Sequence, residues 1–354
     1  MNYASDILED DILYGWPDVL QTLLKDHTTK RNIIWATDMY VKDYGEAYSF
    51  FNEIVVEQIT GPLGKVIRPR AEKSKEEQIQ RVKDKAEVFT PAWICNAQNN
   101  LIDEAWFGRT EGLFNRPDPD NPQKWINNEE KIVFPEGKTW KDYVADTRLE
   151  ITCGEAPYLA NRYDAVTGEY NANVKYRIGM LDRKLRIVSE NAKDSKEWLV
   201  WGKVALRATY GFEWQGDNLL LAREALFFTF AEHFIAAFGE KKFNQLKKTV
   251  MPGAAYIISW NLWQMDGLKF GIPGYEPYVE KKTEKSANQY SLLDDDNFFD
   301  GEEKKHEIQP YERFCIIKDF LHGVNLKKEN LTSRDFHDQS APTQTFESLV
   351  HTQI

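Results

Sequence analysis

The stretch EITCGEAPYL, residues 150–159, says most about the fold of this 354-residue chain. An acidic residue, Glu150, stands at the end of an expected strand, and a turn of small residues around Gly154 leads into a predicted helix start at Pro157. In a doubly wound α/β sheet, such a turn lets a ligand approach the backbone at the carboxyl end of a strand. The acid suits a cationic or hydroxyl-bearing group, and the helix amides suit an anionic one. An amino-acid-like ligand matches both, although an ordinary strand-to-helix turn with a glycine explains the pattern as well.

A second segment, YGFEWQGDN at residues 210–218, repeats the arrangement. We expect a strand over 206–213 that ends in Glu213, followed by a helix over 217–238. A carboxylate at the end of the second strand can accept hydrogen bonds from both hydroxyls of a ribose. The chain has no Gly-x-Gly-x-x-Gly turn of the kind that holds a dinucleotide pyrophosphate. The pattern therefore predicts a ligand that carries a ribose without a pyrophosphate.

Alternating strands and helices predict an α/β sheet for the middle of the chain. A further apolar strand is expected over 254–260, and a stretch rich in Asn, Pro, Asp and Gly indicates an inserted loop over about 107–145. We divide the chain into a helical N-terminal region, a sheet-containing domain and a polar extension, whose end is expected to be mobile or to fold on a partner. These parts cover residues 1–80, 81–275 and 276–354, and the expected mobile end covers 331–354.

These segments, together with EVFTP at residues 87–91, resemble the DNA adenine-N6 methyltransferases of restriction-modification systems, which bind S-adenosylmethionine. The resemblance covers about residues 82–265. It implies a Rossmann-like class I S-adenosylmethionine-dependent methyltransferase fold with a helical N-terminal layer and insertions. It also implies that the Phe-Thr-Pro segment holds the methionine end of the cofactor and that the acid after the second strand holds the ribose. The implied cofactor-binding residues are Phe89, Thr90, Pro91, Glu150, Thr152, Cys153, Gly154, Glu155, Ala156, Glu213 and Trp214.

In this family, an Asn/Asp-Pro-Pro-Tyr/Phe motif after the fourth strand accepts hydrogen bonds from the target amine and stacks on a flipped-out adenine. The matching stretch is SWNLWQ at residues 259–264, in which both prolines are missing and Trp263 stands one position early. The resemblance implies that Asn261 accepts from the amine and that Trp263 or Trp260 stacks on the base. The plainer interpretation makes both tryptophans core residues and Asn261 a turn residue at the strand end.

The charge balance limits how the chain can contact DNA. It carries 45 Lys and Arg against 56 Asp and Glu, a net charge of −11, which is unlike a domain that simply coats nucleic acid. DNA contact is therefore expected only at the single basic cluster between residues 65 and 85, unless that cluster is a solvated helix face. Its basic residues are Lys65, Arg68, Arg70, Lys73, Lys75, Arg81, Lys83 and Lys85.

Several classes of protein are not indicated. Three scattered cysteines and six histidines without metal-ligand spacing predict neither a disulfide framework nor a metal site. The acidic start of the chain and the lack of a long apolar window predict a cytoplasmic protein without a membrane span.

The function that the resemblance implies is S-adenosylmethionine-dependent methyl transfer to the N6 amine of adenine in DNA, in a restriction-modification or phage-defence setting. Only 90 residues follow Gln264, fewer than a large target-recognition domain needs, which leaves room for a partner protein subunit. The main alternative is a non-catalytic methyltransferase-like component that serves in DNA binding, assembly or anti-restriction. Methyl transfer to RNA or to a small molecule is a third possibility.

Overall fold

A small parallel sheet lies at the centre of the computed structural model, which describes residues 9–85, 87–88, 90–275 and 313–351. Its strands are β3 (Arg148–Ile151), β4 (Thr209–Glu213) and β5 (Leu262–Gln264), in the order β3-β4-β5. Ile151 lies opposite Phe212, and Glu213 lies opposite Gln264. The carboxyl ends of all three strands therefore meet at one edge of the sheet.

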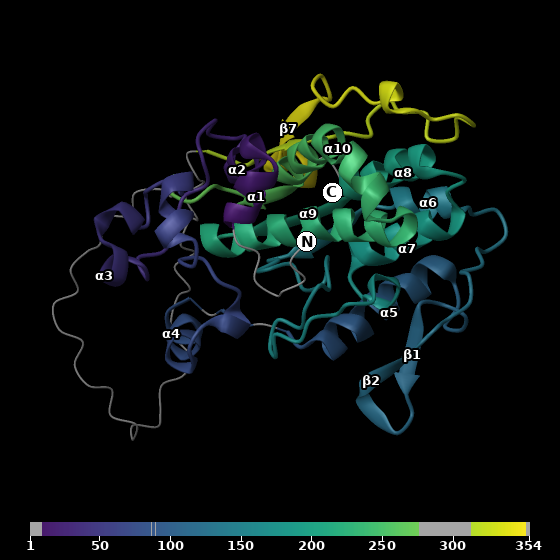
Figure 1. Cartoon of the computed structure of the whole chain (residues 1–354), viewed down its shortest axis with the longest axis horizontal. Helices are drawn as coiled ribbons and strands as arrows, with labels where there is room; N and C mark the ends of the chain where they lie inside the picture. Colours follow the sequence, from purple (N-terminus) through teal and green to yellow (C-terminus); the bar gives the residue numbers. More distant parts are fainter. Residues whose placement is uncertain (1–8, 86, 89, 276–312, 352–354) are drawn as a thin grey trace, which may run out of the picture.

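Two pairs of helices make the crossovers that a parallel sheet requires. The first pair, α7 (Met180–Asn191) and α8 (Ser195–Arg207), connects β3 to β4. The second pair, α9 (Gly216–Phe238) and α10 (Glu240–Asn261), connects β4 to β5. In Figure 1, α9 crosses the middle of the molecule, with α10 alongside it and α7 and α8 towards one end. Every residue of α9 up to Phe234 is buried, which explains why apolar side chains are not confined to one face of this helix.

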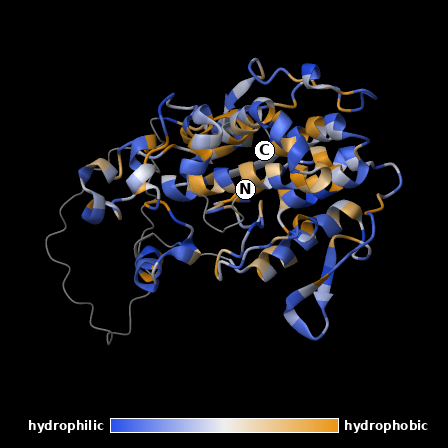
Figure 2. Ribbon diagram, in the orientation of Figure 1, coloured by the Kyte–Doolittle hydropathy of each residue, from blue (hydrophilic) through white to orange (hydrophobic). Residues whose placement is uncertain are grey.

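The two faces of the sheet have different coverings. The large hydrophobic core extends through α2, α7, α8, α9 and α10. A smaller cluster joins Phe212 and Trp263 to Ile272, Ile317 and Phe346, which come from residues beyond the sheet. Figure 2 shows hydrophobic residues concentrated in the central helices, whereas the hairpin that projects from the body is largely hydrophilic.

The remaining elements surround this centre. The other α-helices are α1 (Glu9–Gly15), α2 (Pro17–Leu24), α3 (Val41–Tyr44), α4 (Lys75–Lys85), α5 (Ala92–Phe107), α6 (Trp140–Ala145) and α11 (Phe346–His351). The 3-10 helices are η1 (Glu46–Tyr48), η2 (Val56–Gln58), η3 (Gly61–Leu63), η4 (Arg70–Glu72), η5 (Val174–Tyr176) and η6 (Ser333–Asp335). Two antiparallel pairs are formed by β1 (Asn115–Asp118) with β2 (Asn121–Asn127) and by β6 (Ile316–Lys318) with β7 (Thr343–Thr345).

The structure confirms the mixed α/β class, with small sheets. The strand expected over 206–213 is β4, and the helix expected over 217–238 is α9. The inserted loop expected over about 107–145 contains the β1–β2 hairpin and α6. The helical N-terminal region is helical only in part, because α1, α2 and α3 alternate with irregular backbone and 3-10 turns.

The strand prediction for residues 254–260 is wrong. These residues belong to α10, which continues through Pro252 to Asn261, so the strand starts only at Leu262. The helix predicted to start at Pro157 is also absent. Met180 and Leu181 donate their amide hydrogens to the carbonyls of Tyr158 and Leu159, at 2.8 and 2.9 Å, so these carbonyls are already bonded to the start of α7.

The described part of the C-terminal extension packs against the rest of this chain. Leu331, Phe336 and Phe346 are buried, and Asp338 pairs with Arg207 of α8 at 2.7 Å. Residues 331–351 therefore fold on their own chain, where a mobile end or an arm for a partner was expected. The C-terminal extension also contains a stretch rich in Asp and Glu over residues 294–303, which lies outside the described residues. No helix among the described residues is long and apolar enough to span a membrane.

Candidate functional site

A cavity of about 280 Å³ opens at the carboxyl ends of β3 and β4. This edge of a parallel sheet is where α/β proteins commonly bind ligands. The cavity collects residues from three segments that are far apart in the sequence: Glu87, Val88 and Thr90, the turn after β3, and the end of β4 with the start of α9. Its lining residues are Glu87, Val88, Thr90, Glu150, Thr152, Cys153, Gly154, Pro157, Tyr158, Glu213, Trp214, Gln215 and Asn218.

The turn after β3 fits closely against β4. Cys153 donates its amide hydrogen to the carbonyl of Phe212 at 2.8 Å, and Gly154 donates to the Glu213 carboxylate at 3.0 Å. Gly154 has a φ of +51° and Ala156 a φ of +64°, in the left-handed region that turns the chain sharply. A side chain at Gly211 would come within 3.2 Å of the Cys153 sulfur, so this glycine permits the close approach.

Two buried carboxyl groups face the cavity without a cationic partner among the described residues. Glu213 accepts hydrogen bonds from the amides of Gly154 and Gln215, at 3.0 and 3.1 Å, yet burial raises its pKa to about 7. Burial also raises the pKa of Glu150 well above its ordinary value, and the nearby charge of Glu213 adds to this effect. One oxygen of Glu150 accepts from the amide of Tyr158 at 3.4 Å, and the other is buried without a partner. A ligand that brings positive charge or hydroxyl donors would satisfy these acceptors.

Glu87 contributes a third carboxylate to the wall. One of its oxygens accepts from Arg81 at 2.7 Å, from Asn218 at 3.1 Å and from Gln215 at 3.3 Å. Its other oxygen and the amide oxygens of Gln215 and Asn218 are buried without a partner. The cavity is therefore rich in acceptors that the protein itself leaves unused.

A buried charge network behind this wall fixes Glu87 in place. Arg81 bonds to Asp217, the second residue of α9, and Tyr40 donates to the same carboxylate at 2.7 Å. Burial alone would raise the pKa of Asp217, but the charge of Arg81 lowers it to about 2. Lys73 lies 4.0 Å from this carboxylate and is itself buried.

Of the eleven implied cofactor residues, seven line the cavity, three do not, and Phe89 lies outside the described residues. Glu155 faces away from it and accepts from the amide of Arg70 at 2.6 Å and from the hydroxyl of Tyr163 at 2.7 Å. Pro91 precedes α5 as its N-cap, and Ala156 is not among the lining residues. The seven that line it are Thr90, Glu150, Thr152, Cys153, Gly154, Glu213 and Trp214.

The polar lining residues Glu87, Gln215 and Asn218 were not predicted as site residues. Gln215 and Asn218 flank the start of α9 close to Glu213, so their place after the strand was the signal that could have identified them. No local sequence pattern identifies the Arg81–Asp217 pair, because the two residues are 136 positions apart in the sequence.

Asn261 lies at the opposite edge of the sheet from the cavity. Because α10 continues to Asn261, this residue precedes β5 and does not follow a strand end. Its amide group is completely buried and donates to the carbonyls of Leu206, Arg207 and Thr209 at 2.9, 3.2 and 3.1 Å. This geometry is that of a packing residue that fastens the end of α8 to the starts of β4 and β5.

Neither tryptophan of the SWNLWQ stretch lines the cavity. Trp263 stacks on Tyr210 of β4 with ring centres 5.6 Å apart and also contacts Phe346. Trp260 stacks on His27 at 3.9 Å, and the ammonium of Lys318 lies 4.8 Å from the Trp260 ring. Both side chains therefore agree with the plainer interpretation as core residues. At the carboxyl end of β5, Gln264 binds the carbonyls of Ile34 and Trp214 instead.

The basic cluster of residues 65–85 divides between surface and interior. Lys65, Lys75 and Lys83 are exposed, whereas Lys73 and Arg81 are buried in the network around Asp217. Arg68 pairs with Glu77 at 3.0 Å, Arg70 begins η4, and Lys85 ends α4. Lys73 and Arg81 are thus not available to DNA in this structure, because their charges are used inside the protein.

Comparison with known proteins gives no relative: no family model, no curated protein and no solved structure matches this chain. Among the described residues, no group of three or more His, Cys, Asp or Glu could hold a metal ion.

Proposed function

We propose that this chain binds S-adenosylmethionine and transfers its methyl group to the N6 amine of adenine in DNA, on a Rossmann-like scaffold of the methyltransferase type. The observation that carries the proposal is the cavity at the ends of β3 and β4. It gathers Thr90, the turn from Glu150 to Gly154, and Glu213 with Trp214, which come from three of the four segments that carry the family resemblance. The choice of adenine in DNA and the restriction-modification setting rest on that resemblance.

The lining residues fit such a cofactor chemically. The cavity offers carboxylate and amide oxygens without partners, which suit an ammonium, a sulfonium and a ribose diol. Glu213 would accept from the ribose hydroxyls, while Glu150 and Thr90 would hold the methionine end. When bound, the cofactor supplies an electrophilic methyl group. The chain's contribution is then to position the amine in line with that methyl, which needs no general base in the first step.

Calorimetry with S-adenosylmethionine tests the proposal. The intact protein is expected to bind it, and Glu213→Gln is expected to weaken binding by about tenfold, because a charged acceptor for two hydroxyls is lost. Glu136→Gln removes an exposed carboxylate away from the cavity and serves as the matched control. Absence of binding to the intact protein would refute the cofactor assignment.

A second candidate function is a non-catalytic component on the same scaffold. The positions of Asn261, Trp260 and Trp263 favour it, because none of the three faces the cavity. Sequencing of DNA from a host that expresses the protein, with detection of N6-methyladenine, separates the two. Modified adenine in the host DNA supports the enzyme, and cofactor binding without modified adenine supports the non-catalytic component.

A further inference from the structure

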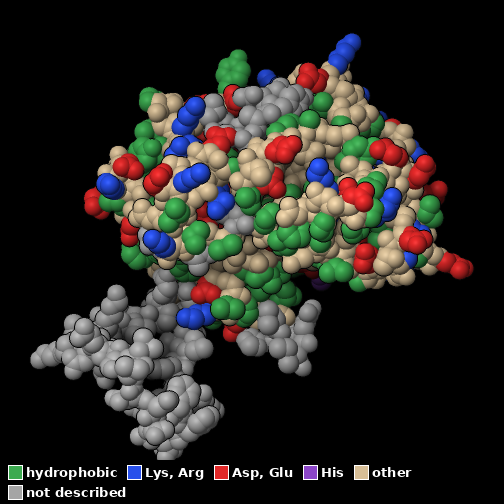
Figure 3. Space-filling model, turned by 90° about the horizontal axis from the view of Figure 1, so that it is seen from below, with side chains coloured by type: hydrophobic (Ala, Val, Ile, Leu, Met, Phe, Trp, Pro, Cys, Tyr) green, Lys and Arg blue, Asp and Glu red, His purple; other side chains and the backbone are tan. Residues whose placement is uncertain are grey.

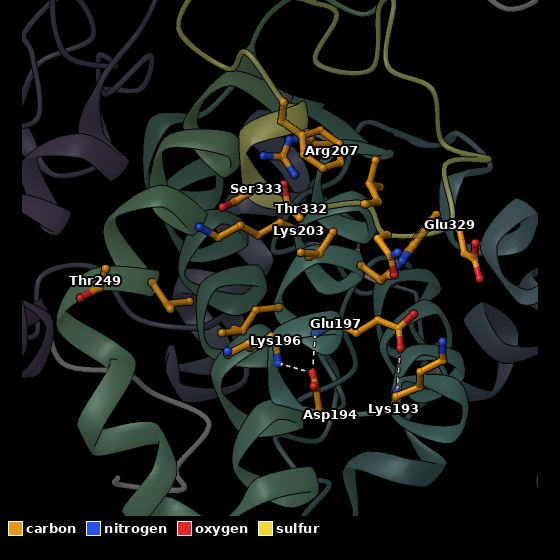
Figure 4. Close-up of a pocket in the computed structure, with 17 residues that line it drawn as sticks. Lys193, Asp194, Lys196, Glu197, Lys203, Arg207, Thr249, Glu329, Thr332 and Ser333 are labelled. Atoms are coloured by element: carbon orange, nitrogen blue, oxygen red, sulfur yellow. Dashed lines mark hydrogen bonds between the residues drawn. The ribbon is translucent and has the colours of Figure 1, made fainter.

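A second cavity, of about 580 Å³, lies between α8, α10 and residues 329–336 of the C-terminal segment (Figure 4). It is separate from the cavity at the sheet edge, because the two share no lining residue. Its walls include the apolar side chains Leu199, Val200, Val250, Leu331 and Phe336. These walls can accommodate an apolar or aromatic body of small-molecule size.

Two cationic side chains lie one helical turn apart on α8 and line this cavity. Arg207 binds Asp338 through two of its nitrogens, at 2.7 and 2.9 Å, and its guanidinium stacks over the ring of Phe336 at 4.0 Å. Its third nitrogen, Nη1, is buried without a partner, and the side chain is only 3% exposed. The guanidinium group of Arg207 is therefore held in place by these contacts, and one of its donor nitrogens has no partner.

Lys203 adds a second cation that has no partner. Among the described residues, it forms neither a hydrogen bond nor an ion pair. Burial lowers its pKa, and the neighbouring charge of Arg207 lowers it further. Asp338 is the nearby acid that opposes this effect, but its two oxygens already bind Arg207.

The acids that line the cavity, Asp194, Glu197 and Glu329, form no ion pair with Lys203 or Arg207 among the described residues. Asp194 accepts from the amides of Lys196 and Glu197 as the N-cap of α8, at 2.8 and 2.9 Å. Glu197 in turn accepts from the amide of Lys193 at 2.8 Å. Figure 4 shows these contacts at one end of the cavity, while Lys203 and Arg207 lie at the other end beside Thr332 and Ser333.

We propose that this cavity binds a small organic anion: one phosphate or carboxylate group on an apolar or aromatic body. The anionic group would lie between Lys203 and the unused Nη1 of Arg207, because it would satisfy one buried donor and one uncompensated charge together. The body would pack against Val250 and Phe336. Such a ligand would contact both α8 and the C-terminal segment and would thereby hold that segment on the helix.

Calorimetry on the full chain tests this site with 1-naphthyl phosphate and 1-naphthoate, which differ only in their anionic group. Either one is expected to bind, whereas 1-naphthol and inorganic phosphate, which each supply half of the ligand, bind at least about tenfold more weakly. Lys203→Met keeps the apolar stem of the lysine and removes its charge, so it is expected to weaken binding by about tenfold. Lys242→Met, an exposed lysine of α10 outside the cavity, is the matched control and should bind as the wild type does.

A second variant distinguishes a lost site from a damaged fold. Val250→Trp fills the cavity and leaves every charge in place, so it should abolish binding while the circular dichroism spectrum stays that of the wild type. No heat of binding with either naphthyl anion at about 5 mM would overturn the proposal. Equal losses in Lys203→Met and Lys242→Met would overturn it too, because binding would then follow net charge and not the cavity.

Discussion

Glu213 is the residue whose environment sets it apart most clearly from an ordinary surface acid. It ends β4, is buried and lines the cavity together with Glu150. Two backbone amides stabilise its charged form, but burial outweighs them and raises its pKa from 4.5 to about 7. The protein therefore maintains a carboxyl group that changes its charge near neutral pH.

This pKa predicts a dependence of stability on pH. Between about pH 4.5 and 7, folded Glu213 holds a proton that the unfolded chain has released, so its contribution to the free energy of unfolding is complete below pH 4.5 and is lost as the pH rises to 7. The slope from one such group is at most about 1.4 kcal/mol per pH unit. Urea unfolding of the wild type and Glu213→Gln at several pH values should show that the variant's relative stability rises with pH.

Glu136→Gln provides the control for that series, since Glu136 is exposed. It should leave the pH slope of the wild type unchanged. A Glu213→Gln variant with the same slope as the wild type would show that Glu213 stays ionised in the folded protein throughout this range.

At the scale of single elements, the end of α10 depends on Asn261. Replacement by Ala removes the side-chain donor that the carbonyls of Leu206, Arg207 and Thr209 share. We expect Asn261→Ala to lower the free energy of unfolding by about 2–4 kcal/mol. Chemical denaturation measures this loss, and Asn244→Ala, at an exposed position of α10, should stay within about 0.5 kcal/mol of the wild type. Unchanged stability in Asn261→Ala would contradict the packing role.

The start of α9 is joined just as closely to the N-terminal region. Gly216 donates its amide hydrogen to the carbonyl of Trp35 at 3.1 Å, and a side chain on it would lie 2.1 Å from the carbonyl oxygen of Ile34. We expect Gly216→Ala to cost about 2–3 kcal/mol, because backbone must move apart at this contact. Thermal unfolding measures this loss. Gly15→Ala is the control, because open space surrounds its new methyl group and its stability should be unchanged or slightly raised. Equal melting temperatures for the two variants would show that the contact adapts without cost.

The strands of the central sheet and helix α10 show which features the sequence could predict and which it could not. The acids that follow β3 and β4 were identifiable because a strand and its terminal residue are adjacent in sequence, and both line the cavity. The apolar run over 254–260 predicts a strand, but a short apolar run fits a buried helix as well as a strand. In the structure it continues a helix that begins at Glu240 and passes through Pro252, which by local rules should interrupt it.

Local sequence patterns could not predict contacts between residues that are far apart in the chain. Arg81 belongs to a run that looks like a solvated basic face, yet it is buried against Asp217 because α4 and α9 meet in the folded chain. The place of Asn261 could not be predicted for a related reason. Shifting the strand start from residue 254 to residue 262 moves Asn261 from the end of a strand to the residue before one.

For the whole molecule, the question is where an acidic protein could contact DNA. The face shown in Figure 3 carries basic and acidic side chains interspersed, without one extended basic area. Of the cluster over 65–85, three exposed lysines lack an ion pair among the described residues: Lys65, Lys75 and Lys83. We propose that these three lysines contact DNA phosphates, which would account for a small, salt-sensitive part of the affinity.

Replacing these three lysines together by Gln is expected to weaken binding to duplex DNA and to make it less dependent on salt. Each lost phosphate contact lowers the slope of log affinity against log salt by about 0.9, so the triple variant should lose at most about 3 in slope. Fluorescence anisotropy with a labelled duplex over a range of salt concentrations measures both quantities. The control replaces Lys241, Lys242 and Lys248 of α10, which are also exposed and carry the same charge. Because both variants lower the net charge equally, a similar loss in each would mean that long-range attraction and not contact explains the binding, and the residue 65–85 cluster would then have no specific part in it.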